Sequence, residues 1–235
     1  MSTYLEDRFT SFIQRDAVKT TFELGSRDLE DAVKLYDYYK CPVYAFECNE
    51  DCLKVCRKTQ ESMTVAQKEN VHLVDSAVCV KNGPVIFYPF DLAKYDNMGS
   101  SSMLKIDFSK RSPNDGDYKR ENPQKEITVQ GVRMDTFMTD KNINSVDLLC
   151  MDLQGYELNA LLSFGQKLDN VRYIITECQI NQTYTGGVEW KDLYSFLYVR
   201  GFEYIVSDRY GTAIPFEPES GAFTEFNALF KNTNL

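Results

Sequence analysis

Short apolar runs alternate along the chain with longer amphipathic segments. Most of these runs are bounded on at least one side by Gly, Pro or an acidic residue, a pattern typical of buried strands. The predicted strands cover residues 20–24, 43–46, 71–74, 85–88, 127–129, 147–151, 173–176, 202–206 and 228–230. Strands that alternate with helical segments predict an α/β fold with a largely parallel sheet, in a single domain over residues 1–235.

Apolar residues at helical spacing predict the helices between these strands. An N-terminal helix is expected over residues 1–19, with Leu5, Phe9, Phe12 and Ile13 on one side. The other predicted helices cover residues 28–40, a segment that starts at 49 or 51, 134–138, 156–164 and 193–199.

The polar stretch 107–126 interrupts the alternation of strands and helices. Its centre reads Ser-Lys-Arg-Ser-Pro-Asn-Asp-Gly-Asp, with no apolar period. Long loops in compact domains are usually functional lids or disordered segments. We therefore interpret 107–126 as a loop that can act as a lid.

Composition is that of a soluble globular protein, with 43% hydrophobic and 26% charged residues in a length of 235. The formal net charge of −9 disfavours a nucleic-acid partner or an anionic membrane, because phosphate contacts need clustered Lys and Arg. No apolar run is long enough to span a bilayer, and the N-terminus lacks the basic and apolar regions of a secretory signal. We therefore expect a cytoplasmic protein that is not inserted in a membrane.

Seven cysteines in a chain without an export signal are expected to stay reduced. Cys48, Cys52 and Cys56 recur every four residues and share one helical stripe. A metal cluster would need a further Cys or His nearby, and the spacing supplies none. The stripe is better explained as small apolar residues that face the sheet.

Candidate ligand-binding residues lie where the early strands end. Glu23, Gly25 and Ser26 mark a turn that lets backbone approach a ligand closely, although a plain tight turn also explains the glycine. Glu47 closes the second strand roughly 20 residues later, where an acidic side chain can bind a ribose diol. A solvent-exposed strand end is the alternative for Glu47. Asp75 ends the third strand, either beside a purine ring or as a helix cap.

Acidic residues also end two later strands. Asp152 follows the apolar run 148–151, and Glu177 ends the next predicted strand in the same way. Carboxylates gathered at one crevice shift each other's pKa values and can serve as a base or as metal ligands. Asp152 and Glu177 are the candidate ligands for a divalent metal, Mg²⁺ or Mn²⁺. Glu157 is better explained as a helix cap.

Histidine and aromatic residues give weaker signals. His72, the only histidine, lies in a strand pattern and is expected in the core or at an edge. Tyr184, Gly186 and Trp190 follow the strand that ends at Glu177. They are placed to line a substrate pocket, since aromatic rings stack on sugars and purines, but aromatic residues are also common in cores.

Several segments, each weak alone, together carry a family resemblance. They are Phe22-Glu23-Leu24-Gly25-Ser26, Tyr44-Ala45-Phe46-Glu47-Cys48-Asn49, Asp75-Ser76-Ala77-Val78, Gly99-Ser100-Ser101-Ser102-Met103, Val132-Arg133-Met134-Asp135-Thr136-Phe137, the run from Val146 to Glu157, Ile174-Ile175-Thr176-Glu177 and Gly201-Phe202-Glu203. In their order and spacing they resemble the FkbM-type S-adenosylmethionine-dependent methyltransferases over residues 20–230.

The resemblance implies a Rossmann-like class I methyltransferase fold. This is a seven-stranded, mostly parallel sheet whose last strand is antiparallel, with helices on both faces. The residues that it assigns to S-adenosylmethionine are Glu23, Gly25, Ser26, Glu47, Cys48, Asp75, Ser76, Ala77 and Asp152. Glu47 would hold the ribose, Asp75 to Ala77 would border the adenine, and Asp152 would lie near the methyl donor.

Members of the family commonly methylate a hydroxyl group, often on a sugar. This chain is also similar to methyltransferase domains fused to glycosyltransferases in chloroviruses, which cap deoxysugars such as rhamnose; a viral protein would act in the host cytoplasm. Two positions depart from the family pattern. Leu29 stands where the first loop usually has a further glycine, and Gln154 replaces the usual Glu of the Asp-Val-Glu-Gly segment.

The lead hypothesis is O-methyl transfer to a sugar hydroxyl of a glycan. Asp152 is the candidate base, with Glu177 as helper or alternative. An acidic protein suits the positive sulfonium of the donor. One rival is the same fold acting on an amine or a small metabolite, and another is a non-catalytic, nucleotide-binding Rossmann-like module. A nicotinamide-dependent oxidoreductase is disfavoured because Gly-x-Gly-x-x-Gly is missing.

Overall fold

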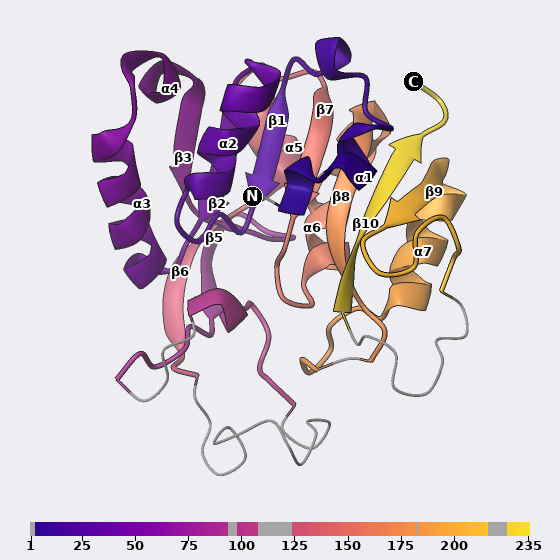
Figure 1. The fold of residues 1–235 in the computed structure, drawn as a ribbon. Helices are drawn as coiled ribbons and strands as arrows, with labels where there is room; N and C mark the ends of the chain where they lie inside the picture. The colour runs from indigo at the N-terminus through magenta and orange to yellow at the C-terminus, as the bar shows by residue number, and fades with distance from the viewer. Residues whose placement is uncertain (1–2, 94–97, 108–123, 182, 216–224) are drawn as a thin grey trace.

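A seven-stranded sheet forms the middle of the molecule (Figure 1). The computed structural model describes residues 3–93, 98–107, 124–181, 183–215 and 225–235. The sheet strands are β1 (Thr21–Leu24), β2 (Val43–Glu47), β3 (Val71–Asp75), β7 (Val146–Met151), β8 (Val171–Gln179), β9 (Phe202–Ser207) and β10 (Glu225–Asn232). Their order is β3-β2-β1-β7-β8-β10-β9.

Strand order reverses between β1 and β7, which pair in parallel. The other neighbours are parallel as far as β8, whereas β10 runs antiparallel to both β8 and β9. This confirms the expected Rossmann-like sheet with an antiparallel last strand. A reversal of strand order opens a crevice at the carboxyl ends of the strands, and that crevice is the usual ligand site of such sheets.

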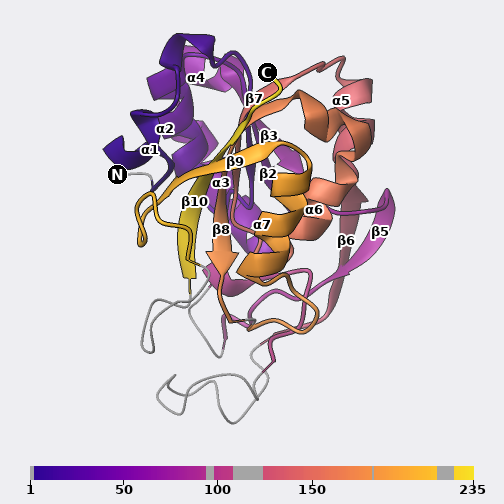
Figure 2. The same ribbon diagram turned by 90° about the vertical axis from the view of Figure 1, so that its right-hand side faces the viewer.

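Helices cover both faces of the sheet (Figure 2). They are α1 (Asp7–Thr10), α2 (Glu30–Tyr39), α3 (Glu50–Ser62), α4 (Val65–Asn70), α5 (Met134–Asp140), α6 (Glu157–Ser163) and α7 (Trp190–Val199), with 3-10 turns at η1 (Thr3–Leu5), η2 (Arg15–Ala17), η3 (Met98–Ser100) and η6 (Gly165–Asn170). In Figure 2 the layer of α1, α2 and α4 lies on one side of the strands, and α5, α6 and α7 lie on the other.

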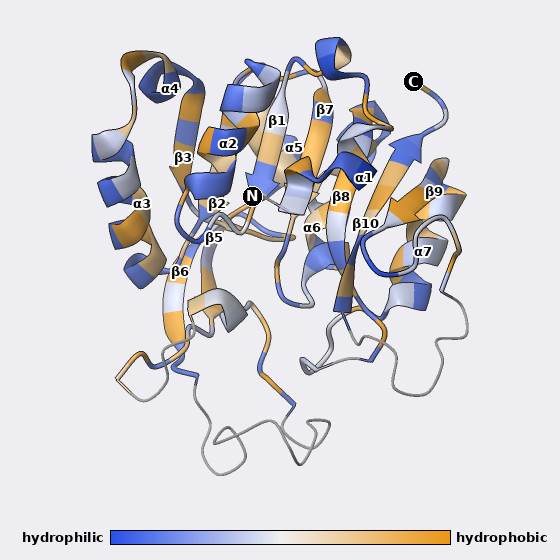
Figure 3. Cartoon of the chain, viewed as in Figure 1, coloured by the Kyte–Doolittle hydropathy of each residue, from blue (hydrophilic) through white to orange (hydrophobic). Residues whose placement is uncertain are grey.

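Strand β7 shows how the sequence produces these layers. All six of its residues are buried, as expected for a parallel strand with helices on both faces. Leu148 and Cys150 join the core beside α2, whereas Leu149 and Met151 join the core beside α6. Alternate side chains of a strand point to opposite faces, so one apolar run supplies both cores. Strand β7 accordingly carries the apolar colour in Figure 3, whereas β1 is paler because it contains Thr21 and Glu23.

A second, three-stranded sheet corrects one prediction. Strands were correctly expected near residues 85–88 and 127–129, but β5 (Gly83–Phe87) and β6 (Ile127–Val132) lie outside the main sheet. They pair antiparallel, and β4 (Ala77–Val78) adds to β6 in parallel. Side chains of β5 alternate between buried and exposed, because only one face of this sheet is covered. In Figure 1 the small sheet extends below β2 and β3, at the carboxyl end of the main sheet.

The expected N-terminal helix over residues 1–19 is wrong. Within the described residues 3–19 the structure has only the short elements η1, α1 and η2. Tyr4, Phe9 and Ile13 are all buried in the core beside α2, but Phe12, expected on the same side, is 46% exposed. The segment bends to bury its apolar residues against the fold, and this packing overrides helical periodicity.

Two further expectations concern the loop and the membrane. The centre of the expected lid 107–126 lies outside the described residues. Among the residues that the structure does describe, no helix combines the length and apolar character needed to cross a membrane.

Candidate functional site

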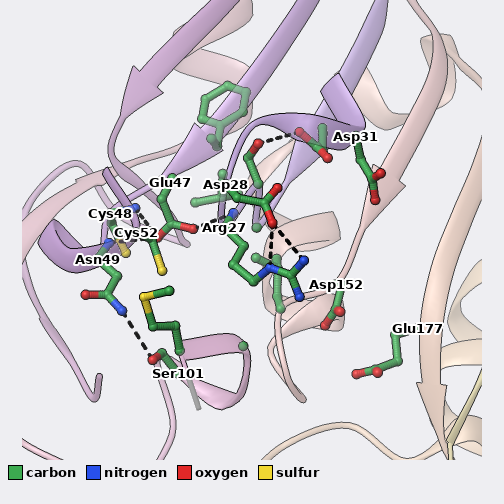
Figure 4. Close-up of a pocket in the computed structure, with 18 of the residues that line it drawn as sticks. Arg27, Asp28, Asp31, Glu47, Cys48, Asn49, Cys52, Ser101, Asp152 and Glu177 are labelled. Carbon is green, nitrogen blue, oxygen red and sulfur yellow. Dashed lines mark hydrogen bonds and ion pairs between the residues drawn. The ribbon is translucent and has the colours of Figure 1, made fainter. Parts of the chain in front are cut away.

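A cavity of about 420 Å³ lies at the carboxyl ends of β1, β2 and β7, where strand order reverses. This volume falls within the range of small-molecule sites. The predicted residues that line it are Glu23, Gly25, Ser26, Glu47, Cys48, Ser76, Ala77, Asp152 and Glu177. Figure 4 shows several of them converging from separate elements on one space. The structure therefore brings together residues that lie far apart in the sequence.

Gly25 sets the shape of the first loop. Its φ of +89° is the left-handed region that favours glycine, and a Cβ atom would lie 2.1 Å from the Asp152 carbonyl oxygen. The amide groups of Gly25 and Ser26 donate to the Phe46 carbonyl at 3.0 and 2.9 Å. The absent side chain lets the loop after β1 pack directly against the end of β7, which forms the floor of the cavity.

Leu29 adopts a left-handed backbone conformation, which glycine adopts most easily. Its φ is +68°, and its side chain is completely buried in the core beside α2. A left-handed leucine costs about 1–2 kcal/mol, which burial of a leucine side chain offsets. The departure from the family pattern at this position therefore leaves the start of α2 in place.

Glu23 is a buried acid in the cavity wall. The Ser26 hydroxyl donates to its Oε2 at 2.6 Å. Burial raises the pKa of Glu23 to about 8, because desolvation penalises the charged carboxylate. The side chain is therefore largely protonated at neutral pH while the cavity is empty, and a cation bound nearby would favour its ionisation.

Glu47 holds the loops around it through backbone donors. Its Oε2 accepts from the Arg27 amide at 2.9 Å, and its Oε1 accepts from the Cys48 and Asn49 amides at 2.7 Å each. Burial raises the pKa of Glu47, and the three hydrogen bonds oppose that rise. The carboxylate is fixed at the end of β2 and lines the cavity (Figure 4).

The third strand ends with one of its three predicted residues outside the cavity lining. Ser76 and Ala77 line the cavity, but Asp75 does not. Its carboxylate is exposed and accepts from the Arg57 guanidinium at 3.0 Å. Neighbouring side chains of a strand point to opposite sides, so Asp75 and Ser76 do not face the same space.

Three carboxyl groups meet on the other side of the cavity. One oxygen each from Asp152, Glu157 and Glu177 lies within 4.8 Å of the others. Burial raises the pKa of Asp152, and burial together with the Asp152 charge raises that of Glu177 further. Such a pair favours a state in which one carboxylate is charged and the other holds a proton.

Glu157 does not cap α6 as expected, because the N-cap residue of this helix is Tyr156 and no side-chain cap hydrogen bond is present there. Glu157 is 2% exposed, and its Oε1 accepts from the amides of Leu153 and Gly155 at 2.8 and 3.2 Å. Burial raises its pKa to about 7. Because these bonds tie Glu157 to the turn before α6, it does not face the cavity as Asp152 and Glu177 do.

Gln154 occupies the space between the two cavity carboxylates. Its Nε2 donates to Asp152 Oδ1 at 2.7 Å and to Glu177 Oε2 at 3.0 Å. Amide hydrogens cannot ligate a metal, and here they cover oxygens that a metal would need. The residues as arranged therefore do not fit the divalent metal expected at Asp152 and Glu177.

The weaker sequence candidates lie outside the cavity lining. Trp190 packs in the core, 5.0 Å from the Phe226 ring centroid, and Tyr184 is buried with its hydroxyl against Gln154. His72 stacks on Tyr44 at 4.8 Å on strand β3. Neither aromatic residue, nor Gly186, lines the cavity.

The cysteine stripe is apolar, as expected. Cys52 and Cys56 are buried, and all seven cysteines are free thiols. Among the described residues no metal-binding group includes a cysteine. Cys48 and Cys52 also line the cavity, and burial raises the pKa of both thiols.

Tyr4 is a cavity residue that the sequence did not indicate. It lies in η1, far in sequence from the strands, and is 6% exposed while lining the cavity. Its hydroxyl has no hydrogen bond to the described residues. Burial and the nearby Asp152 raise the pKa of this hydroxyl, so it remains a donor. Arg27, Asp31 and Asn227 are further lining residues without a sequence signal.

Comparison with known proteins gives a family and a fold. The model of the methyltransferase FkbM domain matches residues 25–204. The 2-O-methyltransferase NoeI of Sinorhizobium fredii is 24% identical over 169 residues, which cover 70% of this chain and 65% of NoeI. The chain thus spans less than two thirds of the length of that relative.

Two solved structures share the fold at low sequence identity. M. capricolum TrmK, in complex with S-adenosyl-homocysteine, superposes with a TM-score of 0.52 at 11% identity, over 99% of this chain and 69% of TrmK. The fibrillarin pre-rRNA processing protein of Methanococcus jannaschii superposes with a TM-score of 0.50 at 10% identity. The match covers 93% of this chain and 68% of the fibrillarin chain.

Proposed function

The chain belongs to the FkbM methyltransferase family, and on that premise we propose that it transfers a methyl group from S-adenosylmethionine to a sugar hydroxyl of a glycan. The observation that carries the proposal is the shape of the cavity. One side is built from the loop after β1 and the end of β2, and the other side presents Asp152 and Glu177. A nucleoside donor and an alcohol acceptor can therefore meet in one space.

The donor half would hold the cofactor through residues already fixed in place. Glu47 is our ribose ligand, since its carboxylate is held at the end of β2 and lines the cavity. Ser76 and Ala77 border the adenine. The acidic side chains around the cavity, Glu23 and Asp31 among them, suit the positive sulfonium.

The acceptor half would supply the base. In the proposed reaction the acceptor oxygen attacks the methyl carbon in line with the departing sulfur, and its proton passes to Asp152. Alignment of oxygen, carbon and sulfur alone can contribute on the order of 7–11 kcal/mol. Glu177 would assist by holding the hydroxyl or by taking the proton itself.

A terminal deoxyhexose such as rhamnose is the acceptor that we propose. NoeI acts as a 2-O-methyltransferase, which supports an oxygen acceptor. We choose a deoxysugar because the sequence resembles chlorovirus domains that cap rhamnose. We place the reaction in a reducing, cytoplasmic setting, where seven free thiols persist, and without a divalent metal, because Gln154 covers the oxygens that one would use.

Methyl transfer from labelled S-adenosylmethionine tests the proposal. We expect label in a rhamnose-terminated oligosaccharide and none in free amines. Asp152→Asn should lower turnover about 100-fold or more, the scale of general-base catalysis, while S-adenosylhomocysteine affinity changes little. Label in amines alone would favour the rival substrate class. Thermal stabilisation by NAD, with none by S-adenosylhomocysteine, would favour a different nucleotide-binding module.

A further inference from the structure

Gln154 lies in a tight turn that aims its side chain between the two acids. Its φ is +53°, and Gly155 follows at +91°, so the turn between β7 and α6 places two successive residues in the left-handed region. Left-handed backbone is costly for a residue with a side chain. In this conformation the amide nitrogen bridges Asp152 Oδ1 at 2.7 Å and Glu177 Oε2 at 3.0 Å, which uses both of its hydrogens.

The other end of the amide contacts Tyr184. The Tyr184 hydroxyl lies 2.8 Å from Gln154 Oε1 and 3.0 Å from the Ser100 carbonyl oxygen, and its single hydrogen is donated to one of these two acceptors at a time. A flipped amide would aim its carbonyl oxygen at two carboxyl groups. The nitrogen end, which carries partial positive charge, therefore points at the acids.

We propose that the Gln154 amide takes the place of a divalent cation between Asp152 and Glu177 and positions both for the acceptor hydroxyl. The inference rests on the proposed function and adds that the reaction is independent of metal. Each carboxylate uses one oxygen for the amide. Asp152 and Glu177 also share a hydrogen bond with each other, so the amide and this bond together fix both side chains. Gln154 is therefore a positioning residue that acts through its two neighbours.

The amide performs two tasks of a metal. It draws together two acidic groups that would otherwise repel each other, and it sets their orientation with charge-assisted hydrogen bonds. Unlike a metal it leaves no open coordination position. Substitution of its NH₂ group by oxygen, in Gln154→Glu, would add a further carboxylate to Asp152, Glu157 and Glu177. Such an oxygen-rich cluster suits Mn²⁺ or Mg²⁺.

The experiment compares the parent, Gln154→Glu and Gln130→Glu. Gln130 is exposed on β6, away from the cavity, so its substitution adds the same charge without touching the acids. Mn²⁺ binding is followed by electron paramagnetic resonance, and S-adenosylhomocysteine binding by calorimetry. Methyl transfer is measured after EDTA treatment, with and without added Mn²⁺.

We expect the parent to keep its turnover after EDTA. Gln154→Glu should bind Mn²⁺ about tenfold or more tightly than Gln130→Glu does, because substitutions around metal ligands typically change metal affinity by about this factor or more. Turnover of Gln154→Glu should also depend on added Mn²⁺. Parent turnover that EDTA abolishes and Mn²⁺ restores would overturn the inference. Equal Mn²⁺ affinity of the two variants would also overturn it.

The binding and turnover measurements separate this inference from the proposed function. Mn²⁺ binding is measured without any acceptor, so it tests the role of Gln154 even if no glycan is methylated. If Gln154→Glu does not fold, the EDTA experiment on the parent decides alone. Loss of glycan methylation with a normal Mn²⁺ result would reject the acceptor and leave the role of the amide standing.

Discussion

Two buried glutamates in the cavity wall differ in how their carboxylates are held. Glu47 accepts three backbone hydrogen bonds, whereas Glu23 accepts one from the Ser26 hydroxyl. Hydrogen bonds to a carboxylate stabilise its charged form and oppose the effect of burial. Glu47 is therefore suited to act as a charged ligand, and Glu23 as a group whose charge depends on what the cavity contains.

Substitution of Glu47 tests its double role. Glu47→Ala should weaken S-adenosylhomocysteine binding about tenfold or more, and should lower the free energy of unfolding by about 1–3 kcal/mol, because three amides lose a buried acceptor. Calorimetry and urea unfolding measure the two effects. Glu50→Ala, an exposed acid in the first turn of α3, is the control. Equal affinity of both variants would remove Glu47 from the cofactor site.

Glu23 makes stability depend on pH. Its folded-state pKa of about 8 lies above the ordinary value of 4.5, so the folded state binds the proton more tightly. The resulting stabilisation is complete below pH 4.5, falls as pH rises, and is lost above pH 8. Its size is on the order of 5 kcal/mol. Glu23→Gln should flatten this slope in urea unfolding between pH 5 and 8.5. A slope unchanged in the variant would assign the pH dependence to other groups.

For individual residues, the sequence predicted most of the acidic side chains that line the cavity, because acidic residues at the ends of parallel strands converge in any open α/β sheet. It missed Tyr4, since nothing local shows that an N-terminal turn returns to the end of β1. It did not indicate that the Asp75 carboxylate is exposed and pairs with Arg57, because the last residue of a strand can face either side. The bridge made by Gln154 depends on side-chain directions that only the folded turn defines.

Among the elements, the loop after β1 depends most on a single residue. Gly25→Ala would place a methyl group 2.1 Å from a backbone oxygen at φ +89°. Gly83→Ala is the matched control, since its φ is +96° and its added Cβ meets nothing within 4 Å. We expect Gly83→Ala to cost about 1–2 kcal/mol of unfolding free energy, and Gly25→Ala to cost more and to abolish S-adenosylhomocysteine binding. Similar costs for the two variants would show that the loop can move away from β7.

The N-terminal segment should contribute to cofactor binding through Tyr4. Tyr4→Phe removes only the hydroxyl, so S-adenosylhomocysteine affinity should fall about tenfold, while stability should change by less than about 1 kcal/mol. Tyr39→Phe is the control, because the Tyr39 hydroxyl is also buried and unpaired within the described residues but does not line the cavity. An equal effect of both variants on affinity would exclude a direct contact with Tyr4.

Elements with strong periodicity were predicted well, and those defined by distant partners were not. The run 147–151 could only be a buried strand, and β7 lies there. Residues 85–88 and 127–129 also read as strands, but a short strand does not reveal which sheet it joins. The segment 1–19 has apolar residues near helical spacing, yet contacts with α2 and the sheet decide its path.

For the whole molecule, the net charge of −9 leads us to expect that the substrate is not a nucleic acid. The shared fold with a pre-rRNA processing protein does not imply an RNA substrate. With a net charge of −9, the chain should not bind transfer RNA in filter-binding assays at about 0.15 M salt. A basic RNA-binding protein is the positive control. Retention of RNA that weakens steeply as salt rises would contradict this expectation.

The small sheet has a consequence for how new specificities arise. Phe87 and Ile127 are direct partners on the antiparallel pair β5–β6, so everything between them departs from and returns to one point. The described residues of that excursion also reach the cavity, since Met98, Gly99 and Ser101 line it and the Asn49 side-chain amide donates to Ser101 Oγ at 3.3 Å. A change of acceptor that arises by altering this excursion therefore has to preserve those contacts if the enzyme is to keep the same donor.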